Sequence, residues 1–510
     1  MQKIIFKITS LFLAMVLSLR VLCDNVCAED ETDEIVLRVS NWEEYIDLGD
    51  WDEEELIDLD SASIIGEQSM VEDFEEWYYE TYGRKVRVEY STFGTNEDLY
   101  SQLRLGDVYD LICPSEYMIM KLMREDMLTP LSDDFFDRDN ELNYYVNGVS
   151  PFIWNTFESN EINGEKWSKY AACYMWGITG IVYNPDEVTE EEASTWQILN
   201  NSDFRRQVTI KDNVRDAYFP TVGILFREKL MSDEFLNDDN YRKNLLDVMN
   251  TADDATIDAA ENLLKEIKNN VYSFETDSGK ADMVTGKVFA NLQWSGDAVY
   301  TMDQAEEDDL FLSWAVPEEC TNLWLDGWVM LKAGINNDAD RQHAAEAFIN
   351  FVSRPDNAVR NMYYIGYTSS ISGGDSSLIF EYADWCYGAE EDEEDVVSYP
   401  LGYFFSGDNN DEEYMLITNE EMTQRQLSAQ YPTQDEINRS AVMMYFDDET
   451  NAKINQMWIN VRCFNISQIS DRTWIVLGCV VAVIALAVVI YILRHKIFRR
   501  KMKKGYYVAD

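Results

Sequence analysis

The stretch Tyr109-Asp110-Leu111-Ile112-Cys113-Pro114-Ser115-Glu116-Tyr117 predicts a short apolar strand that turns directly into a helix. Alternating and β-branched apolar residues predict further strands, and apolar residues at helical spacing predict helices. In chain order, these elements are a strand at 35–40, a helix at 69–82, a strand at 85–90 and a helix at 96–105. Strands that alternate with helices predict an α/β fold with largely parallel sheets.

The second half of the chain repeats this pattern. Strands are expected at 177–183, 207–211, 289–293 and 323–332, and the last is expected to cross between two lobes. Ligands of such folds bind beyond the carboxyl ends of the strands. Aromatic and acidic residues follow strands in both halves, so we expect a ligand cleft between two lobes. The first lobe is expected to comprise 29–175 and 325–370, and the second 176–324 and 371–463.

The N-terminus predicts export. Lys3 and Lys7 precede a largely apolar run, and the small residue Ala28 offers a cleavage point, so 1–28 is typical of a secretory signal peptide. Arg20 interrupts the end of the apolar region, which leaves open whether the segment is cleaved.

The C-terminus predicts a membrane anchor. Residues 474–493 form an uninterrupted apolar run of 20 residues, long enough to cross a bilayer as a helix. They follow a linker at 464–473 and precede a basic tail at 494–510, which favours the cytoplasmic side. We therefore expect a single-pass protein of the cell membrane, with its binding domain outside and its C-terminus in the cytoplasm.

The charge of the chain excludes some classes of protein. It has 41 Lys and Arg against 95 Asp and Glu, a formal net charge of −54. Such an acidic surface disfavours nucleic acid and raises the local concentration of small cations. The stretch 47–66 is very acidic and predicts a loop insertion. With only two histidines and no CxxC pair, the sequence predicts no catalytic residue, no metal ligand and no cofactor.

Trp324-Leu325-Asp326-Gly327-Trp328 and Gln293-Trp294-Ser295-Gly296 suggest what the cleft binds. A carboxylate neutralises an ammonium group, and ring faces attract the same charge and cover apolar parts of a ligand. By itself such a cluster is more often part of a core. Its place at the expected lobe crossing favours a site for an organic cation.

Several motifs, in order, resemble the spermidine/putrescine-binding proteins of ABC uptake systems. The resemblance runs from about residue 36 to 370 and rests on Asn41-Trp42-Glu43-Glu44-Tyr45, Tyr90-Ser91-Thr92-Phe93-Gly94-Thr95-Asn96-Glu97, Pro114-Ser115-Glu116-Tyr117, Trp176-Gly177, Trp294-Ser295-Gly296, Trp324-Leu325-Asp326 and Ile365-Gly366-Tyr367. It implies an α/β type II periplasmic-binding-protein fold, whose two lobes close on a linear polyamine. The C-terminal transmembrane helix lies outside the resemblance.

The resemblance also implies which residues bind. The positions that match the family's binding residues are Trp42, Glu44, Tyr45, Ser115, Tyr117, Asn213, Asp216, Trp294, Trp324, Asp326 and Tyr367. Asp326 matches a carboxylate that takes an ammonium group, and Trp294 and Trp324 match tryptophans that sandwich the alkyl chain. The family has two acids three residues apart where this chain has Asn213 and Asp216. One carboxylate is thus lost unless Asp212 turns inward, and the choice between putrescine, spermidine and another cation stays open.

We therefore predict a membrane-tethered substrate-binding protein of an ABC importer. It would capture putrescine or spermidine and deliver it to a permease that works with ATPase subunits. The alternatives are a binding protein for another small solute, such as an amino acid, a sugar or an oligopeptide, and a sensor that signals through its tail. A cell-surface hydrolase with paired carboxylates is also considered, although acid pairs are uninformative in so acidic a chain.

Overall fold

The computed structural model describes residues 34–52, 55–390, 393, 395–463 and 491. The chain divides into two compact units, Met1–Asn451 and Ala452–Asp510. The predicted signal peptide, and all of the predicted membrane span except Tyr491, lie outside the described residues. Within the described ranges, no helix is long and apolar enough to cross a membrane.

One mixed β-sheet forms the core of the first unit. Its strand order is β11-β10-β12-β9-β14-β5-β1-β4. These strands are β1 (Ile35–Trp42), β4 (Val86–Phe93), β5 (Leu111–Ile112), β9 (Ala171–Tyr183), β10 (Val208–Lys211), β11 (Ser273–Glu275), β12 (Ala290–Trp294) and β14 (Thr321–Leu331). Four short strands join its long central strands: β6 (Leu128–Thr129), β13 (Ser313–Ala315), β15 (Thr368–Ser369) and β18 (Ser440–Ala441).

The prediction of largely parallel sheets is confirmed for the outer strands on each side. β1 is parallel to β4 and β5, and β10 is parallel to β11 and β12. The central strands β9 and β14 run antiparallel to each other, and every residue in both is buried. β9 begins at Ala171, earlier than the expected 177, because Ala171–Trp176 pairs with β14.

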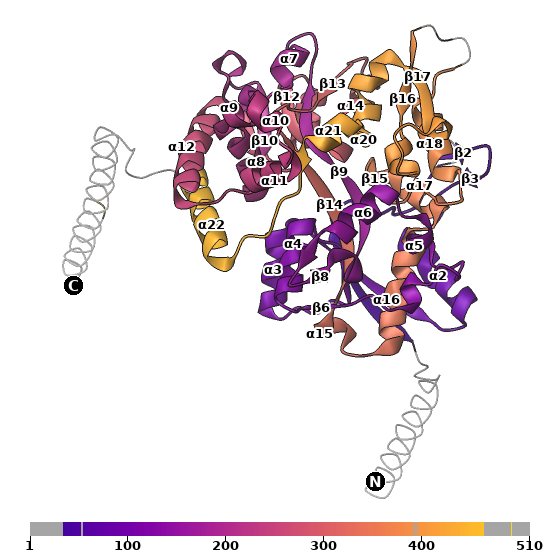
Figure 1. Cartoon of the computed structure of the whole chain (residues 1–510). Helices are drawn as coiled ribbons and strands as arrows, with labels where there is room; N and C mark the ends of the chain where they lie inside the picture. The colour runs from indigo at the N-terminus through magenta and orange to yellow at the C-terminus, as the bar shows by residue number, and fades with distance from the viewer. Residues whose placement is uncertain (1–33, 53–54, 391–392, 394, 464–490, 492–510) are drawn as a thin grey trace, which may run out of the picture. The chain divides into compact units, whose positions relative to one another are not determined.

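Helices cover the sheet, and Figure 1 shows β9 and β14 running between two groups of them. In the first half they are α2 (Met70–Tyr82), α3 (Asn96–Leu105), α4 (Glu116–Arg124), α5 (Tyr144–Gly148) and α6 (Pro151–Ser159). The second group comprises α7 (Glu190–Ala193), α8 (Val214–Leu225), α9 (Arg227–Leu230), α10 (Asp233–Leu236), α11 (Tyr241–Met249), α12 (Asp254–Asn270), α13 (Gly279–Val284) and α14 (Ser295–Glu306). After β14 follow α15 (Lys332–Ile335), α16 (Ala339–Val352) and α17 (Pro355–Ile365).

Local sequence explains where these helices begin and end. Ser69 and Glu72 form a capping box at the start of α2, and Gly83 ends that helix in the left-handed conformation at φ 67°. Asn213 caps α8, because its side-chain oxygen accepts a hydrogen bond from the backbone of Arg215. At the start of α3, the Thr95 side chain accepts a hydrogen bond from the backbone of Asp98. The helices α2, α3 and α8 therefore begin where the sequence places a capping side chain.

The acidic stretch 47–66 is mostly loop, as expected, with one short hairpin of β2 (Ile57–Asp58) and β3 (Ser63–Ile64). Its first residue is nevertheless fully buried. The Asp47 carboxylate accepts a hydrogen bond from Trp51 Nε1 at 3.0 Å and forms an ion pair with Arg360 of α17. The insertion is thus tied to α17 near its start.

The chain after residue 371 adds α18 (Leu378–Tyr387), α19 (Gly402–Phe405), α20 (Gln426–Gln430), α21 (Gln434–Asn438) and α22 (Asp448–Arg462). It also forms a hairpin of β16 (Val396–Pro400) and β17 (Met415–Asn419), while an earlier hairpin joins β7 (Glu161–Ile162) to β8 (Glu165–Lys166). α18 packs on α17 and α19 on α6, whereas α20 packs on α14. Because this segment contacts elements of both predicted lobes, the lobe boundary at 371 stays a prediction.

Candidate ligand-binding site

A cavity of about 880 Å³ opens at the carboxyl ends of the sheet strands. All eleven residues predicted for the site line it: Trp42, Glu44, Tyr45, Ser115, Tyr117, Asn213, Asp216, Trp294, Trp324, Asp326 and Tyr367. Asp212, the alternative carboxylate, is not part of the lining. The structure therefore brings the predicted side chains together, and what they bind is a separate question.

The first turns of four helices place acids at or near this cavity. α3, α4, α8 and α14 begin close to it, and the positive end of a helix dipole ordinarily favours an anion. Each first turn, however, carries a carboxylate of its own: Glu97, Glu116, Asp216 and Asp297. These acids offset the positive ends of the helix dipoles, so the helix starts do not make the cavity a site for an anion.

Asp326 is buried at a break in the pairing of β14 with β9. The register of the two strands shifts between Asp326 and Gly327, and such irregularities re-aim a side chain. The Tyr45 hydroxyl donates to Asp326 Oδ2 at 2.9 Å, whereas Oδ1 has no hydrogen-bond partner among the described residues. Burial raises the pKa of Asp326 to about 7, although the side chains of Ser115 and Tyr45 oppose the rise, and the charge of Asp216 adds to it. A buried carboxylate without an ionic partner is suited to a cation.

Asp216 lies in the first turn of α8, and its charge acts on Asp326 across the cavity. It accepts a hydrogen bond from Trp294 Nε1 at 3.3 Å. Burial raises the pKa of Asp216 to about 6, although that hydrogen bond and the charge of Lys211 oppose the rise. Asn213 lines the cavity too, but its side-chain oxygen is engaged in capping α8. The acids at this end are therefore Asp326 and Asp216, together with Glu116, whose pKa burial raises to about 8.

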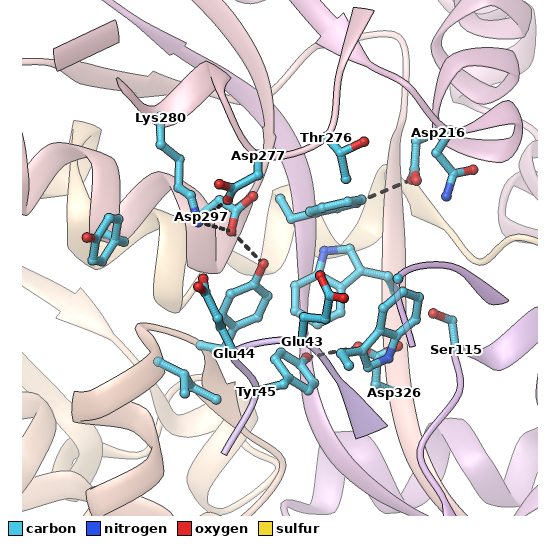
Figure 2. Close-up of a pocket in the computed structure, with 18 of the residues that line it drawn as sticks. Glu43, Glu44, Tyr45, Ser115, Asp216, Thr276, Asp277, Lys280, Asp297 and Asp326 are labelled. Carbon is cyan, nitrogen blue, oxygen red and sulfur yellow. Dashed lines mark hydrogen bonds and ion pairs between the residues drawn. The ribbon is translucent and has the colours of Figure 1, made fainter. Parts of the chain in front are cut away.

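Aromatic rings form the walls between the acids (Figure 2). The ring of Tyr367 lies edge-on to Tyr45 at 5.0 Å between centroids and is 5.6 Å from Trp324. Trp42 packs on Phe93 at 4.7 Å. Such surfaces can cover methylene groups and attract a nearby positive charge.

Ser115 and Tyr117 are held in place by Asn96. Asn96 Nδ2 donates to Ser115 Oγ at 3.1 Å and to the Tyr117 hydroxyl at 3.0 Å. That hydroxyl in turn donates to Glu97 Oε1 at 3.2 Å. Arg215 lies over the Tyr117 ring at 4.5 Å, so a protein cation already occupies one face of this ring.

Other lining residues were not predicted from the sequence, namely Glu43, Asp277, Lys280, Asp297 and Tyr300. Asp297 accepts a hydrogen bond from the Tyr367 hydroxyl at 2.9 Å and forms an ion pair with Lys211 at 3.1 Å. Burial by itself would raise the pKa of Asp297, but Lys211 and Lys280 bring it below its usual value. Its position one helical turn after Trp294 is the signal that could have identified it.

Gly296 allows Tyr367 to approach the start of α14. A Cβ atom on Gly296 would lie 2.2 Å from the Tyr367 ring, so the ring would have to move. We expect Gly296→Ala to weaken ligand binding about tenfold, since overpacking of this kind costs roughly 1–3 kcal/mol. Titration calorimetry would measure the change. Thermal unfolding of Gly296→Ala checks that the fold is kept, and equal binding by wild type and Gly296→Ala would contradict the expectation.

No metal centre is found in the part of the chain that the structure describes, where no group of three or more His, Cys, Asp or Glu side chains is placed to hold an ion. The cysteines of the described ranges are free thiols: Cys113, Cys173, Cys320, Cys386 and Cys463. His343 lies on the exposed side of α16, where its Nδ1 is 3.0 Å from the Tyr78 hydroxyl. None of these groups adds chemistry to the cavity.

The chain is similar to several known proteins. A family profile described as bacterial extracellular solute-binding protein matches residues 69–375. The spermidine/putrescine-binding periplasmic protein of Escherichia coli (strain K12) is 26% identical over 285 residues, which cover 55% of this chain and 70% of that protein. The putrescine/agmatine-binding protein of Pseudomonas aeruginosa is 22% identical over 291 residues, covering 55% and 71%.

Among solved structures, the fold is similar to PotD of Streptococcus pneumoniae, a spermidine/putrescine ABC transporter substrate-binding protein. The TM-score is 0.52 at 22% identity, and the match covers 84% of this chain and 98% of that one. This likeness confirms the predicted type II periplasmic-binding-protein fold.

Proposed function

Because this chain belongs to the bacterial extracellular solute-binding protein family, whose members bind solutes and are not enzymes, we propose that it captures a linear polyamine. The observation that carries the proposal is the Asp326 carboxylate, which lines the cavity, is buried among aromatic rings and forms no ion pair with Lys or Arg of the described residues. An ammonium group would supply the missing partner and neutralise the charge.

The charge balance of the cavity supports a ligand with more than one positive charge. The lining contains seven acids, Glu43, Glu44, Glu116, Asp216, Asp277, Asp297 and Asp326, against the single base Lys280. Burial raises the pKa of Glu116 to about 8, so this carboxyl adds little charge at neutral pH, and six acids remain. A polyamine carries separated ammonium groups on methylene spacers. Carboxylates would hold its charges, and the rings of Trp42, Trp294 and Trp324 would cover its spacers. The names of the relatives, which bind spermidine, putrescine or agmatine, favour the same ligand class.

An uncharged solute suits this cavity less well. Sugars also bind between tryptophans and acids, but a sugar would leave the charges of Asp326 and Asp216 uncompensated in a buried site. An amino acid would bring a carboxylate close to several others. We therefore place polyamines ahead of other solutes.

A ligand screen tests the proposal. The purified protein would be heated with putrescine, spermidine, agmatine, neutral amino acids or maltose, and its unfolding temperature followed. We expect only the amines to raise it, because a ligand that binds the folded state stabilises that state. A rise with maltose or a neutral amino acid, and none with any amine, would sink the polyamine assignment.

We further propose that the protein serves an ABC importer from the membrane surface. The signal and the span predicted at 1–28 and 474–493 support an extracytoplasmic binding domain held by its tail. The bound amine would pass to a permease driven by ATPase subunits. Removing 474–510 should shift the protein from the membrane fraction to the soluble fraction, and its retention in membranes would refute the tether.

A further inference from the structure

The cavity has two groups of acids, and among the described residues a lysine forms direct ion pairs with only one of them, whereas Lys211 and Arg215 act on Asp216 through their charges alone. In Figure 2, Asp277, Asp297 and Lys280 lie together at the left, whereas Asp216 and Asp326 lie at the right, apart from each other with aromatic rings between them. Neither Asp216 nor Asp326 forms an ion pair with Lys or Arg within the described ranges. Asp277 and Asp297, in contrast, both form ion pairs with lysines.

Lys280 places an ammonium group in that second group of acids. Its Nζ lies 2.6 Å from Asp277 Oδ1 and 3.7 Å from Asp297 Oδ1. It also lies over the ring of Tyr300, 5.2 Å from the centroid. Carboxylates together with a ring face are what a ligand ammonium needs, so Lys280 stands where such a group would bind.

The charges around Lys280 hold it in its protonated form. Burial opposes that form, but Asp297, Asp277 and Glu44 together raise the pKa of Lys280. Glu44 belongs to the loop after β1, whereas Lys280 belongs to α13, so acids from both sides of the cavity act on this lysine. Lys280 is therefore a permanent cation at neutral pH.

We propose that Lys280 stands in for one ammonium group of a polyamine, so that the cavity selects diamines over triamines. The inference rests on the polyamine function proposed above. A diamine can neutralise Asp326 and Asp216 without approaching Lys280. A triamine that extends along the cavity brings its third ammonium toward Lys280, where like charges repel and the acids are already paired.

Two amines and four proteins test this inference. Putrescine and spermidine would be titrated calorimetrically into wild type, Lys280→Ala, Lys280→Arg and Lys287→Ala. Lys287 is the matched control, because it pairs with Asp282 at 2.7 Å and does not line the cavity. Lys280→Ala should keep its fold, since Asp297 retains Lys211 and the Tyr367 hydroxyl as partners. Thermal unfolding checks this point.

We expect wild type to prefer putrescine at least tenfold. Lys280→Ala should shift the ratio of the two dissociation constants at least tenfold toward spermidine, while Lys280→Arg and Lys287→Ala keep the wild-type ratio. The selectivity would be overturned if wild type bound spermidine as tightly as putrescine. It would also be overturned if Lys280→Ala left the ratio of the two dissociation constants unchanged. In either case the proposed polyamine function would stand. Binding of neither amine by wild type would overturn both.

Discussion

Asp326→Asn is expected to weaken polyamine binding by about 2 kcal/mol or more, which is roughly thirtyfold in Kd. The substitution keeps the shape of the side chain and removes its charge. The amide that replaces the carboxylate would keep an oxygen to accept the Tyr45 hydroxyl, which now lies 2.9 Å from Asp326 Oδ2. The ammonium group of the ligand, however, would lose its buried carboxylate partner.

The control for Asp326→Asn is Asp308→Asn, which makes the same change in net charge at an exposed position outside the cavity. We expect Asp308→Asn to bind as wild type does. Both variants should unfold at or above the wild-type temperature, because Asp326→Asn removes a buried charge that has no ionic partner in the described structure. Wild-type affinity in Asp326→Asn would show that this carboxylate does not hold the ligand.

Polyamine affinity is expected to fall as the pH falls from 8 to 5. Burial raises the pKa of Asp326 to about 7 and that of Asp216 to about 6 in the ligand-free protein. Alkyl amines titrate near pH 10, so the ligand stays charged throughout this range. The ligand prefers the ionised carboxylates, and protons must leave before it binds. Acid therefore competes with the ligand.

The expected size of this pH effect follows from the pKa of Asp326. At pH 8 most Asp326 carboxyls are ionised, whereas at pH 5 only about one in a hundred is ionised. The Kd should therefore rise about thirtyfold or more between these pH values. Calorimetry in buffers of different ionisation heat should also detect proton release near pH 6–7. Asp326→Asn should show a shallower pH dependence, governed by Asp216. An affinity that stays constant from pH 8 to 5 would contradict the role of both acids.

Local patterns were sufficient to predict most strands and helices of the first unit. Alternation and capping residues mark β1, α2, α3 and β10 in the sequence, and the structure places them within a few residues of the expected ranges. The start of β9 was missed because Ala171–Trp176 is buried on both faces. Such a run lacks the alternation of apolar and polar residues that would distinguish a strand from another buried segment.

The predicted site residues share one cavity because they follow strands in both halves of the chain or, like Trp324 and Asp326, lie within the central strand β14. What the sequence could not show are pairings between distant residues. Asp47 lies in an acidic run that favours solvent, yet Arg360, far along the chain, buries it in an ion pair. Lys280 lies on a short polar helix, and only the folded chain brings it to Asp297. Both effects depend on tertiary contacts.

Titration calorimetry of putrescine into the purified full chain at pH 8 tests the central claim most directly. We expect saturable one-to-one binding with a Kd in the micromolar range or tighter, since two or three desolvated cation–π contacts of about 2 kcal/mol each act together with ion pairs. Absence of heat with putrescine and with spermidine, at millimolar concentrations of either amine, would contradict it.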